Sequence, residues 1–447
     1  MLSLQTGDST LQSTLAKFCY FKNSKTSVSN GFIVSWLISL FVLFGLVGCG
    51  GADSSASSGD TTPAKTVVYN LYDDELNFLG NVSSEDANLW AKAYEYGIEN
   101  WYEADSSEPF DGVYEGNDEV VRLYSVKNVG EVRTEDHLAD IASDLSGKYI
   151  LLNDITLTSD WEPIGTDEEN AFTGILNADT SEGKRYSISG LSITKNDIYA
   201  GLFGVIKNAI IKNIGVVVDR LAGAMNVGGI AGKSISSNIT NSYVLGNITG
   251  DGYVGGIVGN ASVSKIINSY ANVTLSAGDY VGGLAGYVGG SLITNSYAIG
   301  SVGGSFNVGG IAGSINSSIV TSSYTGVDVS GNNSVGNIAG TLFAGNLTGS
   351  IVIDKGDIGD KIKDVVGNII DPYLSKISNS NSSLINSILK SLIDDILDST
   401  IDKALDLIKI KDVYSFDLGW KFGKDDANPW VIGNDGKPVL YWQTWQI

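Results

Sequence analysis

Side chains that commonly carry out catalysis or bind metals are scarce in this sequence. Its 447 residues include a single histidine, His137, and two cysteines. One histidine excludes a His-x-x-x-His metal site, and two cysteines exclude both a cysteine-rich zinc site and a disulfide framework. A Ser-His-Asp triad would have to use His137, which lies in the apolar-patterned stretch 134–144 and is expected to face solvent.

Acidic residues are numerous, and paired carboxylates are the groups with which enzymes cleave polysaccharides, alone or around Ca²⁺. Asp251 and Asp279 occupy corresponding turns of a repeat described below. The next two copies of that turn read Phe306-Asn307 and Asn333-Ser334, so the carboxylates do not form a row. We therefore expect no catalytic residues, no metal and no cofactor, and we keep a polysaccharide lyase or hydrolase as the alternative.

The charge balance excludes one class of partner. The chain carries 50 acidic and 28 basic residues, a formal charge of −22. Nucleic acid is not an expected partner, because a phosphate backbone requires a basic surface. Hydrophobic residues make up 43% of the chain, which is too many for a disordered polyanion.

The N-terminus has the pattern of an export signal. An uncharged apolar run, residues 31–47, follows three lysines, which predicts a signal peptide over residues 1–48. The run ends in Leu46-Val47-Gly48-Cys49, which resembles the bacterial lipobox. The resemblance implies a lipid on Cys49 and, through it, the membrane as a partner. A single membrane-spanning anchor is the alternative, since 17 residues is the short end for a spanning helix.

The middle of the chain repeats with a period of 27 residues. Val227-Gly-Gly-Ile-Ala-Gly232 recurs in closely similar form from Val254, Val281, Val308 and Val335. A second motif keeps the same step, at Asn241-Ser-Tyr243, Asn268-Ser-Tyr270, Asn295-Ser-Tyr297 and Ser322-Ser-Tyr324.

This period predicts a parallel β-solenoid. Two-helix repeats are longer, and helices do not tolerate so much glycine. The segments between the glycines are short and rich in Val, Ile, Thr and Tyr, which favours strands. Each unit would then form one coil, hydrogen-bonded to the coils before and after it.

Residue alternation within a coil predicts two ladders. In the segment 266–273, Asn268 and Tyr270 share one face, opposite the small and β-branched residues that suit the interior. The tyrosines would stack outside as a candidate binding ladder for glycans or proteins, or simply stabilise the solenoid by stacking. The asparagines would stack where the chain turns, as a structural ladder. The members are Tyr243, Tyr270, Tyr297 and Tyr324, and Asn241, Asn268 and Asn295.

At the level of families, the repeats resemble the GLUG motif of bacterial cell-surface proteins. The resemblance rests on Gly201-Leu-Phe-Gly204 and on the units of the type Gly228-Gly-Ile-Ala-Gly232. It extends over about residues 131–355 and 413–447, where the stretch from Trp430 to Trp442 is similar to a usual last coil. It implies a right-handed parallel β-helix on an exported protein, and it implies no catalytic residues.

The flanking regions complete the predicted organisation, which is mainly β. Residues 49–66 are small and polar and predict a flexible linker, and 67–130 predict a small N-terminal capping region. The β-helix of 27-residue coils is expected over 131–355, and 412–447 form a terminal coil or cap. Residues 356–411 carry Leu and Ile at helical spacing opposite acidic side chains, which predicts an amphipathic α-helical insertion.

These observations predict a protein that works by presenting a surface. We expect an exported bacterial lipoprotein on the outer membrane or cell surface that acts as an adhesin or binding protein for glycans or surface proteins. A purely structural envelope protein is a further alternative. The helical insertion would pack on the solenoid, or would join two copies into a homo-oligomer.

Overall fold

The structure is a computed structural model of the 447-residue chain, and it describes part of it. The described residues are 66–84, 95–112, 114, 116, 118–352, 421–432 and 438–445. The predicted signal peptide, Cys49, residues 49–65 of the linker and the predicted helical insertion 356–411 lie outside them. Among the described residues, the α-helix with defined bounds is α4 (Glu135–Asp140), which lies mid-chain. The structure therefore does not support the predicted helical insertion.

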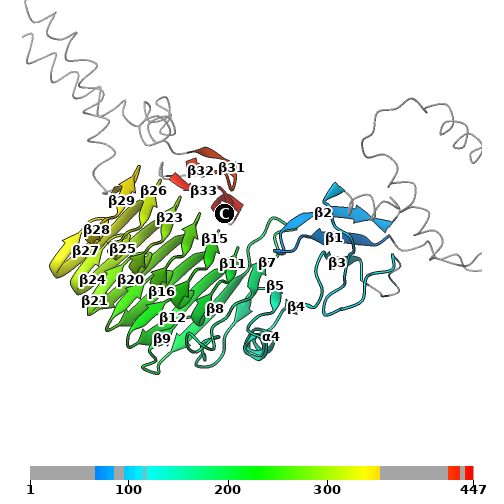
Figure 1. The fold of residues 1–447 in the computed structure, drawn as a ribbon, viewed down its shortest axis with the longest axis horizontal. Helices are drawn as coiled ribbons and strands as arrows, with labels where there is room; N and C mark the ends of the chain where they lie inside the picture. The colour runs from blue at the N-terminus through cyan, green and yellow to red at the C-terminus, as the bar shows by residue number, and fades with distance from the viewer. Residues whose placement is uncertain are drawn as a thin grey trace, which may run out of the picture. The chain divides into compact units, whose positions relative to one another are not determined.

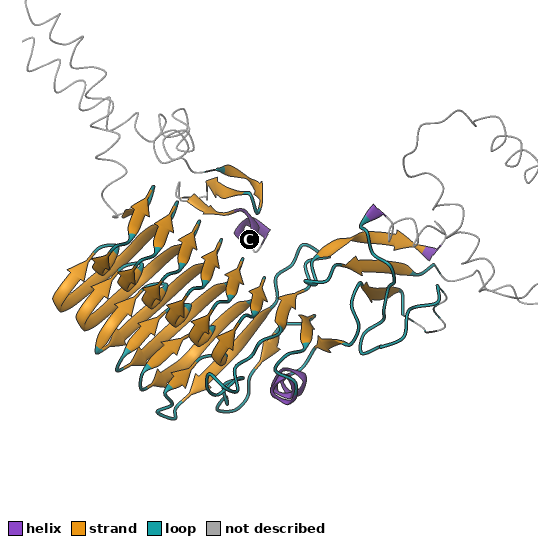
Figure 2. Ribbon diagram, viewed as in Figure 1, coloured by secondary structure: helices purple, strands orange, loops and turns teal. Residues whose placement is uncertain are grey.

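A parallel β-solenoid forms the centre of the protein, as the 27-residue period predicts. Its strands lie side by side in three parallel sheets of nine, six and twelve strands (Figures 1 and 2). The nine-stranded sheet contains β4 (Val129–Val132), β5 (Lys148–Leu151), β7 (Ile175–Ala178), β11 (Ile210–Lys212), β15 (Asn238–Thr240), β19 (Lys265–Ile267), β23 (Leu292–Thr294), β26 (Ile319–Thr321) and β29 (Asn346–Thr348). The six-stranded sheet contains β10 (Phe203–Lys207), β14 (Ala231–Ile235), β18 (Val258–Ser262), β22 (Ala285–Gly289), β25 (Ala312–Asn316) and β28 (Ala339–Phe343).

The third sheet receives strands from two parts of each coil. One set includes the two-residue strand β6 (Ile155–Thr156) and the longer strands β8 (Ser187–Ile193), β12 (Gly215–Gly223), β16 (Tyr243–Gly250) and β20 (Tyr270–Ala277). The other set includes the short strands β9 (Tyr199–Ala200), β13 (Asn226–Gly228), β17 (Tyr253–Gly255) and β21 (Asp279–Gly282). The two sets merge in β24 (Tyr297–Gly309) and β27 (Tyr324–Gly336), and β27 also pairs with β30 (Ile351–Val352).

The pairing register follows the sequence period. Val258 on β18 pairs with Ala285 on β22, and Ala285 pairs with Ala312 on β25. Each step is 27 residues, whereas the step from Phe203 to Ala231 is 28. One coil after another therefore places the same motif position at the same place, which confirms the parallel solenoid.

Small aliphatic residues fill the coil interior. In one coil Val254, Ile257, Val258 and Ala261 are each at most 1% exposed. Serine hydroxyls complete the corners: Ser242 donates its backbone N–H to the Oγ of Ser269, over 3.1 Å, and the next coils repeat the contact. Apolar burial drives the packing, and the serines supply acceptors for backbone donors at the turns.

The Val-Gly-Gly motif marks the tightest approach between coils. A Cβ on Gly282 would lie 2.1 Å from the carbonyl oxygen of Ala285 and 2.4 Å from the Cα of Ala312 in the next coil. Both neighbours are backbone atoms, so a side chain could not be accommodated by a rotamer change. The repeated glycine therefore has a steric cause.

A small three-stranded sheet precedes the solenoid, within the predicted capping region 67–130. It has the order β2 (Phe78–Ser83), β1 (Val68–Tyr72), β3 (Val120–Tyr124), with β2 antiparallel and β3 parallel to β1. Tyr72 and Tyr124 pack in one buried cluster with Ile150 of β5 and Ile175 of β7. This sheet therefore covers apolar residues of the first coils.

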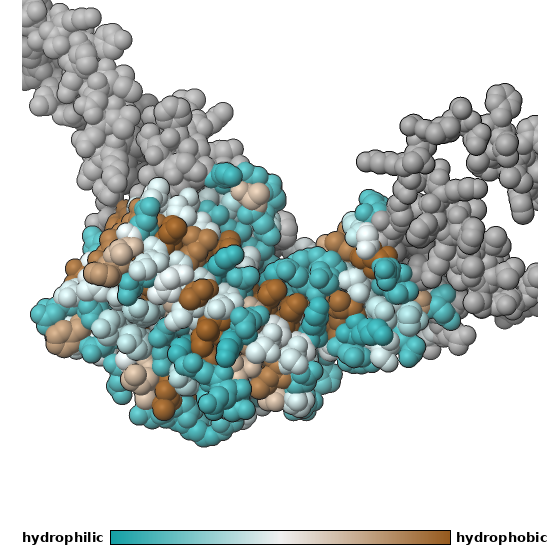
Figure 3. Space-filling model, viewed as in Figure 1, coloured by the Kyte–Doolittle hydropathy of each residue, from teal (hydrophilic) through white to brown (hydrophobic). Residues whose placement is uncertain are grey.

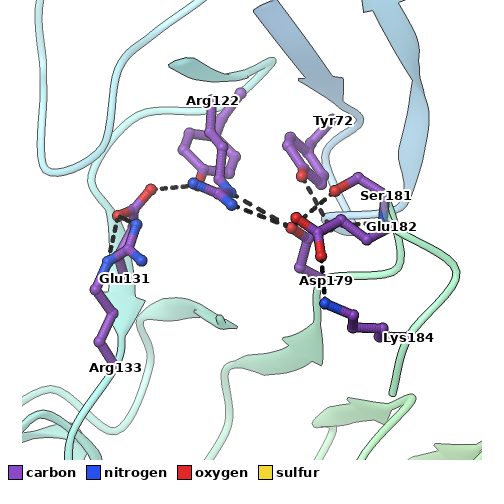
Figure 4. Close-up of polar contacts among 9 residues, drawn as sticks. Tyr72, Arg122, Glu131, Arg133, Asp179, Ser181, Glu182 and Lys184 are labelled. Atoms are coloured by element: carbon purple, nitrogen blue, oxygen red, sulfur yellow. Dashed lines mark hydrogen bonds and ion pairs between the residues drawn. The ribbon is translucent and has the colours of Figure 1, made fainter. Parts of the chain in front are cut away.

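A buried carboxylate links this sheet to the solenoid (Figure 4). Asp179 accepts a 2.8 Å hydrogen bond from Tyr72 Oη and contacts Arg122 Nε at 3.4 Å, and its side chain is 2% exposed. The hydroxyl of Ser181 also donates to Asp179, over 3.0 Å. These partners offset the cost of desolvating the Asp179 carboxylate, so we interpret its contact with Arg122 as a structural ion pair.

The C-terminal residues form a separate antiparallel sheet. Strands β31 (Phe422–Asp425), β32 (Asn428–Ile432) and β33 (Pro438–Leu440) are followed by the 3₁₀-helix η3 (Tyr441–Trp445). Because the solenoid strands are parallel and these are antiparallel, the described C-terminal strands do not form a further parallel coil, and the terminal coil or cap over 412–447 stays a prediction. We call the described residues 421–432 and 438–445 the clasp, for the contacts reported next.

Candidate binding surface

The predicted tyrosine ladder is present as a column of stacked rings. Tyr243, Tyr270, Tyr297 and Tyr324 pair in register on β16, β20, β24 and β27. Successive ring centroids lie 5.3, 5.0 and 4.6 Å apart, with interplanar angles of 10°, 5° and 4°. Offset stacking of this kind stabilises neighbouring coils.

The clasp covers this ladder. Trp442 lies 6.2 Å from Tyr243 and 5.6 Å from Tyr270 between ring centroids, and Trp430 lies 5.9 Å from Tyr324. Tyr324 Oη donates to the carbonyl of Pro438 over 2.9 Å. The four ladder tyrosines are therefore only 2–7% exposed. The hypothesis of an open binding ladder does not match this structure, because the rings pack against the protein's own C-terminal residues.

The asparagine positions lie at the corners next to the ladder. Asn241, Asn268 and Asn295 adopt positive φ of 53°, 50° and 48°, a conformation that asparagine tolerates better than most residues. The amide of Asn295 donates to Asn268 over 3.1 Å. Asn241 donates to Asn213 Oδ1 over 3.2 Å and also to the carboxylate of Asp426 in the clasp, over 3.0 Å. The asparagines thus shape the turns and hold the clasp.

Arg185 forms the centre of the contact between clasp and solenoid. Its guanidinium lies 4.2 Å from the Trp442 ring centroid and donates to Asn213 Oδ1 and to the carbonyl of Asn241. Burial lowers the pKa of Arg185 to about 10, against the opposing effect of Tyr441 and Asp426. A cation–π contact and two acceptors compensate part of this desolvation.

The buried ladder predicts alkaline sensitivity. Burial, and secondarily Tyr243, raises the pKa of Tyr270 above its usual value of 10.0. The neutral form is favoured in the folded state, so this stability is complete below pH 10 and is lost as the pH rises further. We expect tyrosinate absorbance to appear in two phases, the later one together with loss of the clasp. A single phase complete near pH 10 with the fold retained would contradict the buried ladder.

A second group of aromatic residues remains accessible. Tyr253 of β17 and Tyr280 of β21 lie 4.8 Å apart between ring centroids, and Tyr287 of β22 meets Tyr253 edge-on at 5.8 Å. All three are partly exposed. We call Tyr253, Tyr280 and Tyr287 the tyrosine patch. It lies where the twelve-stranded and six-stranded sheets meet, on two successive coils.

Tyr280 has a strained backbone. Its φ is 51°, in the left-handed region that bulky side chains rarely adopt. The corresponding residue in the next coil is Asn307, at φ 53°. Asparagine meets this requirement at lower cost, whereas tyrosine costs on the order of 1–2 kcal/mol. A costly aromatic residue at a partly exposed turn favours a functional role over a structural one.

Polar groups accompany the patch. Burial raises the pKa of Tyr253, followed by smaller effects of Tyr280, Tyr287 and Asp279. Asp279 directly precedes Tyr280 on β21. Asn316 donates to Tyr287 Oη over 3.3 Å. A hollow of about 420 Å³ is lined by residues that shortly precede Tyr253 and Tyr280 in the sequence. These lining residues include Thr249, Asp251 and Ser276.

This arrangement matches the chemistry of a sugar. A pyranose ring has an apolar face of C–H groups and a rim of hydroxyls, so an aromatic ring beside carboxylate and amide groups complements it. The patch does not stand out from the sequence alone, because tyrosine holds this repeat position in only two successive coils, at Tyr253 and Tyr280. The available signal was Tyr-Val-Gly-Gly, which appears at Tyr253 and again at Tyr280.

Two further chemistries find no support in the described part of the chain. No three His, Cys, Asp or Glu side chains there are grouped so as to hold a metal ion. His137 lies on α4, is exposed, and has no place in the tyrosine patch.

No helix among the described residues is both long and apolar enough to cross a bilayer.

Comparisons with known proteins agree with the repeat. Residues 223–249 and 277–303 match the family model of the GLUG motif, and the second match contains Tyr280 and Tyr287. The chain is 27% identical over 213 residues to halomucin of Haloquadratum walsbyi. The matched region is 43% of this chain and 2% of halomucin, so the chain spans a small part of that relative's length. No solved structure matches this chain.

Proposed function

We propose that this protein is a surface-exposed binding protein, or adhesin, that recognises glycans through the tyrosine patch. The observation that carries the proposal is Tyr280, a partly exposed aromatic residue held at a φ of 51° where the next coil uses asparagine. The GLUG-motif solenoid supports a surface-type protein. The partly exposed rings of Tyr253 and Tyr287 beside Asp279 supply the complementary groups.

The proposal includes the location predicted from the N-terminus. Export, lipidation of Cys49 and attachment to the outer membrane or cell surface would present the solenoid to polysaccharides outside the cell. We also propose that the coils of the solenoid are right-handed. The lipobox-like Leu46-Val47-Gly48-Cys49 supports this location. Metabolic labelling with a fatty acid, in the wild type and in Cys49→Ala, tests the lipid separately from glycan binding.

Tyr280→Asn is expected to weaken polysaccharide binding by about tenfold, because one aromatic contact contributes on the order of 1.4 kcal/mol. The relief of backbone strain and the loss of the ring contact with Tyr253 are each about 1 kcal/mol and oppose one another. Stability should therefore stay within about 1 kcal/mol of the wild type. Glycan-array binding and titration calorimetry on the full chain measure the affinity, and thermal unfolding measures the stability.

Tyr199→Asn is the matched control. Tyr199 occupies the corresponding position three coils before Tyr280, since it pairs with Asn226, Asn226 pairs with Tyr253, and Tyr253 precedes Tyr280 by one 27-residue step. It should leave binding unchanged. Equal binding by wild type and Tyr280→Asn would remove the patch from the proposal. Release of new sugar chain ends in the same wells would instead indicate a polysaccharide lyase or hydrolase.

A further inference from the structure

The last coil in the described part of the solenoid exposes residues that are interior in the preceding coils. Val308 is 0% exposed, and Val335, its partner on the next coil, is 44% exposed. Ile315 is 0% exposed, and its partner Leu342 is 48% exposed. Other interior positions of this coil are only partly buried, namely Val329, Ile338 and Leu347. We call these five residues the end face, and apolar residues reach the surface at this end of the solenoid in Figure 3.

The end face lacks the usual protection of a sheet edge. Residues 329–348 contain no Lys, Arg, Asp or Glu. The adjacent Phe343 is 73% exposed. Exposed strand edges normally carry charges, prolines or bulges that prevent further pairing, or they are covered. An uncharged edge with an apolar interior behind it therefore requires a cover.

We propose that residues 384–408 of the same chain cover the end face. The chain leaves the described solenoid through β30, which pairs with β27 of the last coil, and it returns at residue 421 in the clasp. Residues 353–420 are thus attached at both ends to the described structure, beginning at the end face itself. Leu and Ile recur every three or four positions through 384–408, which is the spacing of one apolar face.

Tethering and charge favour this segment over a second copy. A linked segment reaches its site at an effective concentration of the order of millimolar, which a separate molecule does not approach in dilute solution. Two copies would each bring a formal charge of −22 to the contact. That repulsion opposes end-to-end association, whereas the acidic side chains among residues 394–406 would face water on the outside of the cover.

Hydrogen exchange on the full chain tests the proposal. The variant Leu389→Asp/Leu392→Asp/Ile396→Asp places charge on the apolar positions of the segment. The control Ser387→Asp/Ser391→Asp/Ser399→Asp adds the same charge at polar positions. We expect the first variant to accelerate amide exchange in β27, β28 and β29 by about tenfold or more, because local opening governs exchange. The control and the wild type should remain protected there.

The exchange of β16 and β20 serves as the internal reference, since these strands lie several coils away and should not change in any variant. Two results would overturn the proposal. One is unchanged exchange of β27–β29 in the first variant while β16 and β20 stay protected. The other is wild-type protection of the last coil that falls on dilution, which would identify a second copy as the cover.

Discussion

Trp442→Ala is expected to release the clasp from the tyrosine ladder, at a cost of about 3–5 kcal/mol to the free energy of docking. The Trp442 side chain is fully buried and packs on Tyr243 and Tyr270. It also covers the guanidinium of Arg185, which would lose its cation–π partner while remaining largely desolvated. A cavity and a weakened contact to a buried cation therefore add to the lost apolar burial.

Three readouts follow the release. Amide exchange of β31–β33 should become fast, near-ultraviolet circular dichroism from the ladder should change, and the exchange of the inner coils should stay slow. Lys424→Ala, which alters an exposed residue of the same segment, is the control and should resemble the wild type. A Trp442→Ala protein whose clasp exchanges as slowly as in the wild type would show that the ladder does not depend on this ring.

Once released, the ladder would be a free aromatic surface. If glycan binding rises in Trp442→Ala, the ladder has affinity of its own, and the clasp competes with it. If binding depends only on Tyr280, the two aromatic groups have separate roles, one structural and one for recognition. The variant therefore separates the ladder from the tyrosine patch in a single experiment.

The solenoid could be predicted because its determinants are local and repeated. Val254, Val281 and Val308 recur at one period, and each finds its partner one coil away. Glycine at the following position is required by backbone contact at about 2 Å, so the motif itself records the close approach of the coils. The opposite faces of Ser269 and Tyr270 likewise follow from the rule that successive side chains of a strand point to opposite sides of the sheet.

The cover over the ladder could not be predicted in the same way. The contact between Asn241 and Asp426 joins residues far apart in sequence, and Asp426 belongs to no repeat. A period shows which residues stack on one another, but it does not show what packs across the stack. The tyrosine patch was missed for a related reason, since Tyr287 reaches Tyr253 from another strand and breaks the repeat.

Gly282→Ala is expected to destabilise the solenoid by about 3 kcal/mol, because the added methyl group meets backbone rather than a movable side chain. The backbone of Gly282 is not left-handed, so the effect is one of space alone. Gly303→Ala is the matched control: its Cβ would lie 3.3 Å from Ser330 Oγ, the end of a side chain, and 3.6 Å from the carbonyl oxygen of Leu275, an ordinary contact distance. Stability should therefore stay within about 1 kcal/mol of the wild type. Chemical unfolding monitored by far-ultraviolet circular dichroism compares the two. Equal midpoints would mean that the coils can separate at Val-Gly-Gly without cost, and the steric explanation of the repeated glycine would then fail.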